Sequence, residues 1–129
     1  MSTLTFTIPK QLWLTSNRHS INRGHRAAIV ARIKAHVYVE AHRSGMEPFN
    51  GPVAAHWEIR YPKGVRRDKG DATNAQPTTK ACLDALVPRW LADDGPQHVV
   101  SETFRRGPNL DRAGDHEITL LLIDQEVPF

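Results

Sequence analysis

Hydrophobic patterning in the first half of the chain constrains its fold more than any other feature. Apolar side chains alternate with threonines in residues 3–8, and apolar residues occupy every second position in residues 53–61. Strict alternation is typical of strands with one buried face. Between these segments, four apolar residues recur at every fourth position, as on one helix face: Ile29, Ile33, Val37 and Ala41. A strand, a helix and a second strand in this order predict an α/β domain.

Turn-forming residues set the expected bounds of the first two elements. Pro9 ends the strand of residues 3–8, because proline cannot continue a strand ladder. Gly45 can end a helix that covers residues 22–44, since glycine readily adopts the left-handed conformation found after helix ends. We therefore expect this helix to be the longest element of the chain.

A second helix is expected after residue 72. Thr73 or Asn74 can serve as its N-cap, and Gln76 lies where a capping box that starts at Thr73 requires a Gln or Glu. Pro77 is compatible with the first turn only, and Pro88 stops the helix.

Two further strands complete the pattern, at residues 97–104 and 117–123, and we expect them to pair through the connection of residues 105–114. The expected element order is β-α-β-α-β-β. The chain is thus predicted to be one α/β domain, residues 1–129, with a single mixed sheet flanked by helices.

Composition limits the chain to one core and a weakly basic surface. Of its 129 residues 40% are hydrophobic, and Lys and Arg outnumber Asp and Glu by 17 to 14. A single cysteine, Cys82, excludes an intrachain disulfide and favours the reducing cytoplasm. The strand-like apolar run of residues 118–123 is too short to span a bilayer, and the N-terminus lacks a signal-peptide apolar region. We expect a soluble protein with no membrane partner.

A basic segment follows the second strand. It contains five Lys or Arg residues opposed only by Asp68, together with Pro62, Gly64 and Gly70, and this composition predicts a mobile loop. The five are Arg60, Lys63, Arg66, Arg67 and Lys69. Clustered cations of this kind suit a polyanionic partner.

Acidic residues border this loop and the end of the second helix. Asp71 lies at the loop-to-helix junction, and Asp93 and Asp94 lie in the turn before the third strand. If both junctions lie at one end of the sheet, the carboxylates converge in a site that suits Mg²⁺, which one or two carboxylates usually bind together with substrate phosphate. Such a metal can polarise a phosphodiester and activate water, and Lys80, two turns into the helix, could stabilise the phosphoryl charge. Helix caps, a solvated turn and a surface lysine are the competing interpretation.

The same residues form a longer motif between residues 66 and 99. It runs from two arginines through Asp-x-x-Asn, a Pro-Thr-x-Lys helix and an Asp-Ala-Leu ending to a Leu-x-Asp-Asp turn followed by valines. Its members are Arg66, Arg67, Asp71, Asn74, Pro77, Thr78, Lys80, Asp84, Ala85, Leu86, Leu91, Asp93, Asp94, Val99 and Val100. In order and spacing this motif resembles the centre of the RusA family of Holliday junction resolvases, in particular the forms encoded by actinobacterial phages and prophages. The segment LTSNRHSINRG is also similar to the opening of that family, so the resemblance covers nearly the whole chain.

The resemblance implies a RusA-like fold and a specific set of roles. Asp71 and Asp94 would be catalytic carboxylates that bind Mg²⁺, with Mn²⁺ as a substitute, Asp93 would support them, and Lys80 would be the essential lysine. Proteins of this family are homodimers that nick opposing strands of four-way DNA junctions. A cytoplasmic enzyme of a bacterial host, encoded by a phage or prophage and without a small-molecule cofactor, is the resulting expectation.

The chain departs from the family pattern at two positions. In the best-studied branch a second aspartate directly precedes the Asn, whereas this chain has Thr73, which could hold a metal-bound water or act only as the helix N-cap. The loop also carries extra residues, DKG, so Asp68 competes with Asp71 for the first catalytic position. The spacing to Asn74 favours Asp71.

Several other residues are candidates for contacts with DNA or with the acidic site. Those expected along the DNA backbone are Arg66, Arg67, Lys69, Asn17, Arg18 and Arg23. His98 could contact a phosphate or orient a ligand, or it could be a solvent-facing strand residue. Trp90 could stack on an unpaired base, although packing at the helix end is favoured. None of the seven histidines has the spacing or cysteine company of a zinc site.

Taken together, the residues and the resemblance predict a magnesium-dependent, structure-selective DNA endonuclease that works as a homodimer. The alternative is a junction-binding protein that keeps the fold but has lost catalysis with its second acid. A sequence-specific regulator is disfavoured, because the chain shows no helix-turn-helix pattern and its basic residues are expected in loops.

Overall fold

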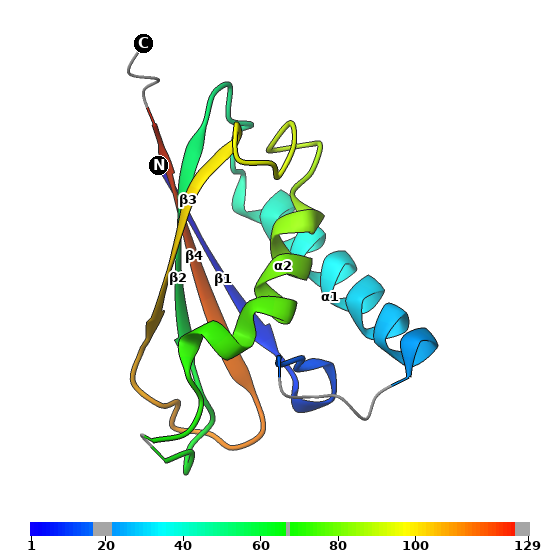
Figure 1. Cartoon of the computed structure of the whole chain (residues 1–129), viewed down its shortest axis with the longest axis vertical. Coiled ribbons are helices and arrows are strands. Elements are labelled where there is room, and N and C mark those ends of the chain that lie inside the picture. Colours follow the sequence, from blue (N-terminus) through cyan, green and yellow to red (C-terminus); the bar gives the residue numbers. More distant parts are fainter. Residues whose placement is uncertain (17–21, 67, 126–129) are drawn as a thin grey trace.

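Four strands form one sheet in the computed structural model, which describes residues 1–16, 22–66 and 68–125 (Figure 1). They are β1 (Ser2–Ile8), β2 (Val53–Arg60), β3 (Val99–Arg106) and β4 (His116–Asp124). The order across the sheet is β1-β4-β2-β3. β2 and β3 are parallel, whereas β4 is antiparallel to both β1 and β2. The mixed sheet and the element order confirm the α/β fold expected from the patterning.

The expected pairing of the last two strands is wrong. β3 and β4 are separated by β2, and the connection between them crosses the end of β2, where Gly107 N–H donates to the carbonyl of Ile59 at 2.9 Å and Leu110 N–H to that of Tyr61 at 2.8 Å. Burial explains the order. β4 alternates buried and half-buried residues along its length, as suits a central strand, whereas β3 is mostly exposed and occupies an edge.

Both helices pack on the same face of the sheet (Figure 1). The first, α1 (Arg23–Ser44), buries the stripe of four residues that the sequence indicated. Its N-cap is Asn22, whose side chain accepts a hydrogen bond from His25 N–H at 2.8 Å, and Gly45, with φ 72°, ends it. The predicted bounds of this helix are therefore confirmed to within one residue.

The second helix, α2 (Gln76–Ala85), starts differently from the expectation. A 3₁₀ turn, η2 (Ala72–Ala75), precedes it, and its N-cap is Ala75, which makes no side-chain capping bond. The proposed capping role of Thr73 is therefore wrong, because N–H groups at the helix start are directed to carbonyls of the 3₁₀ turn instead, as between Gln76 and Thr73. Pro77 lies in the first turn as predicted.

Alternate strand residues and the inner faces of the helices make the core. Its largest fully buried side chains include Phe6, Trp57, Ile33, Leu86 and Leu120. Trp90 is also buried and donates its indole N–H to the carbonyl of Met46 at 2.9 Å, so it packs at the end of α2 and is not available to stack on a base. Across the described ranges of the chain, no helix is long and apolar enough to cross a membrane.

Candidate active site

Lys80, Asp84 and Asp94 form a charged cluster on the outer side of α2. The Nζ atom of Lys80 donates to Oδ1 of Asp84, one helical turn on, at 3.0 Å, and it contacts Oδ2 of Asp94 directly. Asp94 belongs to the connection between α2 and β3, so this contact joins residues 14 positions apart. Asp93 supports the turn, because its carboxylate accepts the backbone N–H of Asp94 at 2.8 Å. The structure thus brings together Lys80, Asp93 and Asp94, which are three of the predicted site residues.

The cluster shifts the pKa of both partners away from neutral pH. The hydrogen bond from Lys80, with a smaller contribution from Asp84, lowers the pKa of Asp94 to about 2. The same bonds, first to Asp94 and then to Asp84, raise the pKa of Lys80. Asp94 is therefore a carboxylate and Lys80 an ammonium group at neutral pH, the charge states that metal ligation and phosphate stabilisation respectively require.

Asp71 lies at the start of η2, and its side chain makes no capping bond there. Its carboxylate is exposed, whereas its backbone carbonyl accepts the Tyr61 hydroxyl at 2.9 Å and the Asn74 N–H at 3.1 Å. The backbone of Asp71 is therefore fixed while the carboxylate faces solvent. Asn74 is tied to the N-terminal segment in turn, because its carbonyl accepts the N–H of Ser16 at 3.0 Å.

Three side chains that the sequence analysis did not single out for this purpose hold the basic loop before Asp71. Tyr61 bonds the Asp71 carbonyl, Arg106 donates from Nε to the Gly70 carbonyl at 3.1 Å, and Asn109 donates from Nδ2 to the Val65 carbonyl at 2.6 Å. The Arg106 guanidinium also lies over the Tyr61 ring, 5.1 Å from its centroid. The acceptors are backbone carbonyls, which carry no sequence signal.

The described charged residues that follow Val65 in the loop lie at the surface. Arg66 pairs with Asp68 at 2.9 Å, and both side chains are exposed, as is Lys69. This pair engages Asp68, whereas Asp71 sits directly on the element that leads to Lys80.

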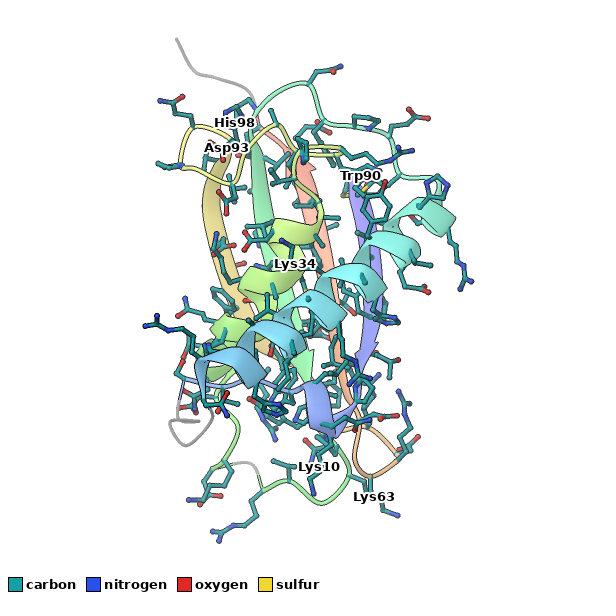
Figure 2. The ribbon with its side chains drawn as sticks, turned by 90° about the vertical axis from the view of Figure 1, so that its right-hand side faces the viewer. Lys10, Lys34, Lys63, Trp90, Asp93 and His98 are labelled. Atoms are coloured by element: carbon teal, nitrogen blue, oxygen red, sulfur yellow. The ribbon has the colours of Figure 1, made fainter. Side chains whose placement is uncertain are left out.

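The two acidic junctions lie at opposite ends of the sheet, contrary to the premise that they share one end. Because β2 and β3 are parallel, the loop after β2 and the connection into β3 are separated by the length of the strands. Figure 2 shows this separation, with Lys63 of the basic loop at one end and Asp93 and His98 at the other. The side chain of Asp94 nevertheless reaches Lys80 in the middle of α2.

Asp71, Asp93 and Asp94 offer the oxygen donors that Mg²⁺ prefers. No group of three or more His, Cys, Asp and Glu side chains in the described part of the chain is arranged to hold a metal ion. Asp71 precedes η2 and Asp94 follows α2, at junctions on opposite ends of the sheet, so the expected convergence of the carboxylates is not seen.

The remaining predicted residues are placed as follows. Asn17, Arg18 and Arg67 lie outside the described residues. Arg23 is exposed at the first position of α1. His98 is half-buried just before β3, where its carbonyl accepts the Val53 N–H at 2.8 Å.

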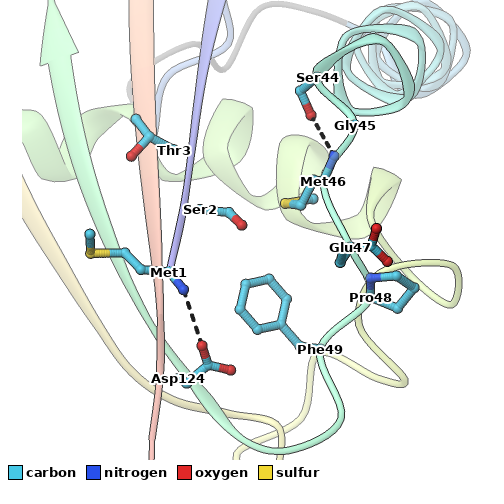
Figure 3. Close-up of a pocket in the computed structure, with 10 residues that line it drawn as sticks. All are labelled: Met1, Ser2, Thr3, Ser44, Gly45, Met46, Glu47, Pro48, Phe49 and Asp124. Atoms are coloured by element: carbon cyan, nitrogen blue, oxygen red, sulfur yellow. Dashed lines mark hydrogen bonds and ion pairs between the residues drawn. The ribbon is translucent and has the colours of Figure 1, made fainter.

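A hollow of about 490 Å³ lies away from this cluster, between the start of β1, the end of β4 and the segment after α1 (Figure 3). Asp124 lines it and pairs with the Met1 ammonium at 3.1 Å, while Phe49 lies between them and the segment after α1. The ten described residues that line this hollow include none of the predicted site residues.

The chain matches no protein-family model and no curated protein sequence. The case for a function therefore rests on the residues and their geometry.

Proposed function

We propose that the chain is a Mg²⁺-dependent, structure-selective endonuclease of the RusA type that resolves four-way DNA junctions. The observation that carries the proposal is the contact between Lys80 and Asp94. The motif resemblance assigns catalytic roles to both residues, and they meet in space although the sequence separates them. A helix cap or a solvated turn would not require this contact.

In this proposal, some residues of the chain act through their charge and others align the DNA. A bound Mg²⁺ supplies the Lewis acidity and the activated water of phosphodiester hydrolysis. Asp71 and Asp94 would hold it, and Lys80 would stabilise the charge that develops on the phosphoryl group. Arg66 and Lys69 attract and align the DNA backbone beside Asp71. A homodimer in the bacterial cytoplasm would present two such sites to the two opposed strands of a junction.

A second candidate function is junction binding without cleavage. It is favoured by the distance between the two acidic junctions and by Thr73, which leaves the start of η2 with one carboxylate. The fold and the basic loop would then serve recognition only.

Nicking of a labelled four-way junction tests the proposal. We expect Mg²⁺-dependent cuts that a linear duplex of the same sequence does not receive. Asp71→Asn and Asp94→Asn should abolish nicking and leave junction binding nearly intact. Asp111→Asn is the matched control, since Asp111 is an exposed carboxylate in the connection between β3 and β4. Tight junction binding without cuts, with Mg²⁺ or Mn²⁺, would support the binding protein instead.

A further inference from the structure

Positive charge is concentrated on α1. This helix carries five of the chain's 17 Lys and Arg residues but only one of its 14 Asp and Glu residues, which is Glu40. The rest of the chain thus has one more acidic than basic residue. The five cations are Arg23, Arg26, Arg32, Lys34 and Arg43. With five cations and one anion, the helix is more positive than the chain as a whole, whose formal net charge is +3.

The cations lie on both sides of the buried stripe of α1. This stripe is at most 3% exposed, and at 3.6 residues per turn its centre lies about 100° from the row described next and about 80° from Lys34. His25, Arg32, His36 and Arg43 are spaced by seven, four and seven residues, so at 3.6 residues per turn they fall within about 40° of one another and span about 27 Å of helix. All four are exposed, and exposed alanines lie beside them, among them Ala28, Ala31 and Ala35.

The fold does not use most of these cations. Within the described residues, no ion pair or side-chain hydrogen bond involves Arg23, Arg26, Arg32 or Lys34. Arg43 pairs with Glu40 at 3.5 Å, and this pair is solvent-exposed and therefore weak. Cations without an ion pair in the described part of the chain remain available to other molecules.

We infer that the exposed surface of α1 binds the phosphate backbone of duplex DNA. Backbone phosphates require only reachable cations, and the small alanine side chains let a phosphodiester chain approach the helix closely. α1 packs beside α2, and Figure 2 shows both helices on the side of the molecule turned away from the sheet, with Lys34 among the side chains there. DNA on α1 therefore lies on the same side of the fold as Lys80.

An anionic membrane surface is the main competitor for a basic helix, and the burial pattern disfavours it. A helix that lies in a membrane interface buries its apolar face in lipid. The apolar stripe of α1 is already buried against the sheet and α2, and the large apolar residues exposed on the helix are Tyr38 and Val39, 44% and 45% exposed. The exposed surface of α1 therefore offers cations along the whole helix, but large apolar side chains at only two adjacent positions.

Salt-dependent DNA binding by the full chain tests the inference. A labelled 30-base-pair duplex would be titrated in EDTA, so that no cleavage is involved, at several salt concentrations. Arg32→Ala with Lys34→Ala should weaken binding and reduce the slope of log Kd against log salt by about 0.9 for each phosphate that the variant no longer neutralises. The matched control, Lys10→Ala with Arg105→Ala, removes the same charge from other surfaces and should leave the slope nearly unchanged. Circular dichroism would establish that both variants are folded.

Three results would overturn the inference. Equal losses of affinity in the two double variants would show a general charge effect. Loss of binding to vesicles of phosphatidylcholine and phosphatidylserine, with DNA binding unchanged, would assign the face to membranes. A changed oligomeric state with unchanged DNA binding would assign it to a second copy of the chain. The inference does not rest on nuclease activity, because a wild-type protein that binds through α1 but never nicks DNA would support it and contradict the proposed function.

Discussion

The hydroxyl of Tyr61 donates a hydrogen bond to the backbone carbonyl of Asp71 at 2.9 Å. This bond joins the end of β2 to the start of η2, and so it fixes the far end of the basic loop. Tyr61 is itself buried, with its ring edge-on to Trp13 at a centroid distance of 5.9 Å. The position of the proposed catalytic carboxylate is thereby coupled to the core.

Tyr61→Phe should lower the nicking rate clearly while it lowers the unfolding free energy only slightly. The variant keeps the ring but leaves the Asp71 carbonyl without this donor, a loss of about 0.5–1.5 kcal/mol of unfolding free energy by the usual net value of one hydrogen bond. Urea denaturation and junction nicking would be compared with Tyr38→Phe, a matched change on the exposed side of α1. If the two variants nick at the same rate, Tyr61 does not position Asp71.

Gly70→Ala should be more destabilising than Gly64→Ala, although both glycines have positive φ. Gly64, with φ 89°, has open space around it, so alanine there costs only the left-handed backbone, about 1–2 kcal/mol. A Cβ on Gly70, with φ 73°, would lie 2.7 Å from the Tyr61 ring, which adds about 1–3 kcal/mol of overpacking. Urea midpoints of the two variants give the comparison. Equal midpoints would mean that the loop moves away from Tyr61 at no cost.

Local patterning predicted where the helices and strands lie along the sequence, whereas the order of the strands in the sheet had to come from the structure. The prediction of the buried stripe on α1 was correct because helical spacing and caps act within a few residues. The pairing of β3 with β4 was wrong because strand adjacency depends on which strand the core buries most, and β2 takes the place between them.

In the site too, the sequence indicated the residues but not their contacts. The motif selected Lys80 and Asp94, and their contact follows from a turn in the connection after α2 that spacing alone does not describe. Arg106 and Asn109 were missed because they act on backbone carbonyls. Asp71 was correctly placed at a helix start, but the 3₁₀ turn that leaves its carboxylate unused for capping has no sequence signature.

Lys80→Met should lose stability at neutral pH and lose less of it in acid. The pKa of Asp94 falls from 3.8 to about 2 on folding, chiefly through Lys80. A carboxyl with a lowered pKa stabilises the fold above its unfolded pKa, and this contribution disappears as the pH falls toward 2. For a partly exposed pair the effect at pH 7 is about 0.2–1 kcal/mol. Urea midpoints at pH 7, 5 and 2.5 would be compared with Lys34→Met, and a difference as large at pH 2.5 as at pH 7 would contradict the assignment.

His116→Phe should make the unfolding free energy less dependent on pH between about 6.5 and 4. Burial lowers the pKa of His116 to about 4, so in this window the unfolded chain binds a proton that the folded chain does not. Stability therefore falls as the pH falls, by up to about 1.4 kcal/mol per pH unit from this residue. Phenylalanine can keep the stack on Trp13, whose centroid lies 3.8 Å away, and it removes a buried Nδ1 that has no partner among the described residues. Urea melts at pH 8, 6 and 4.5 give the slopes, and parallel slopes in both proteins would contradict the prediction.

Thr73→Asp should raise the nicking rate if the native site lacks a ligand. Thr73 is exposed in η2, two residues after Asp71, and it does not cap α2, so an acid there adds a carboxylate beside Asp71 without removing a structural bond. A second carboxylate strengthens the hold on Mg²⁺, and the gain should be largest at low Mg²⁺ concentration. Thr73→Asn, which adds an amide of the same shape without the charge, is the control. Single-turnover nicking over a Mg²⁺ series separates the two variants. A rate that rises equally in both would show that charge is not the missing element, whereas a gain confined to the aspartate would identify the acid deficit at this position as what limits catalysis.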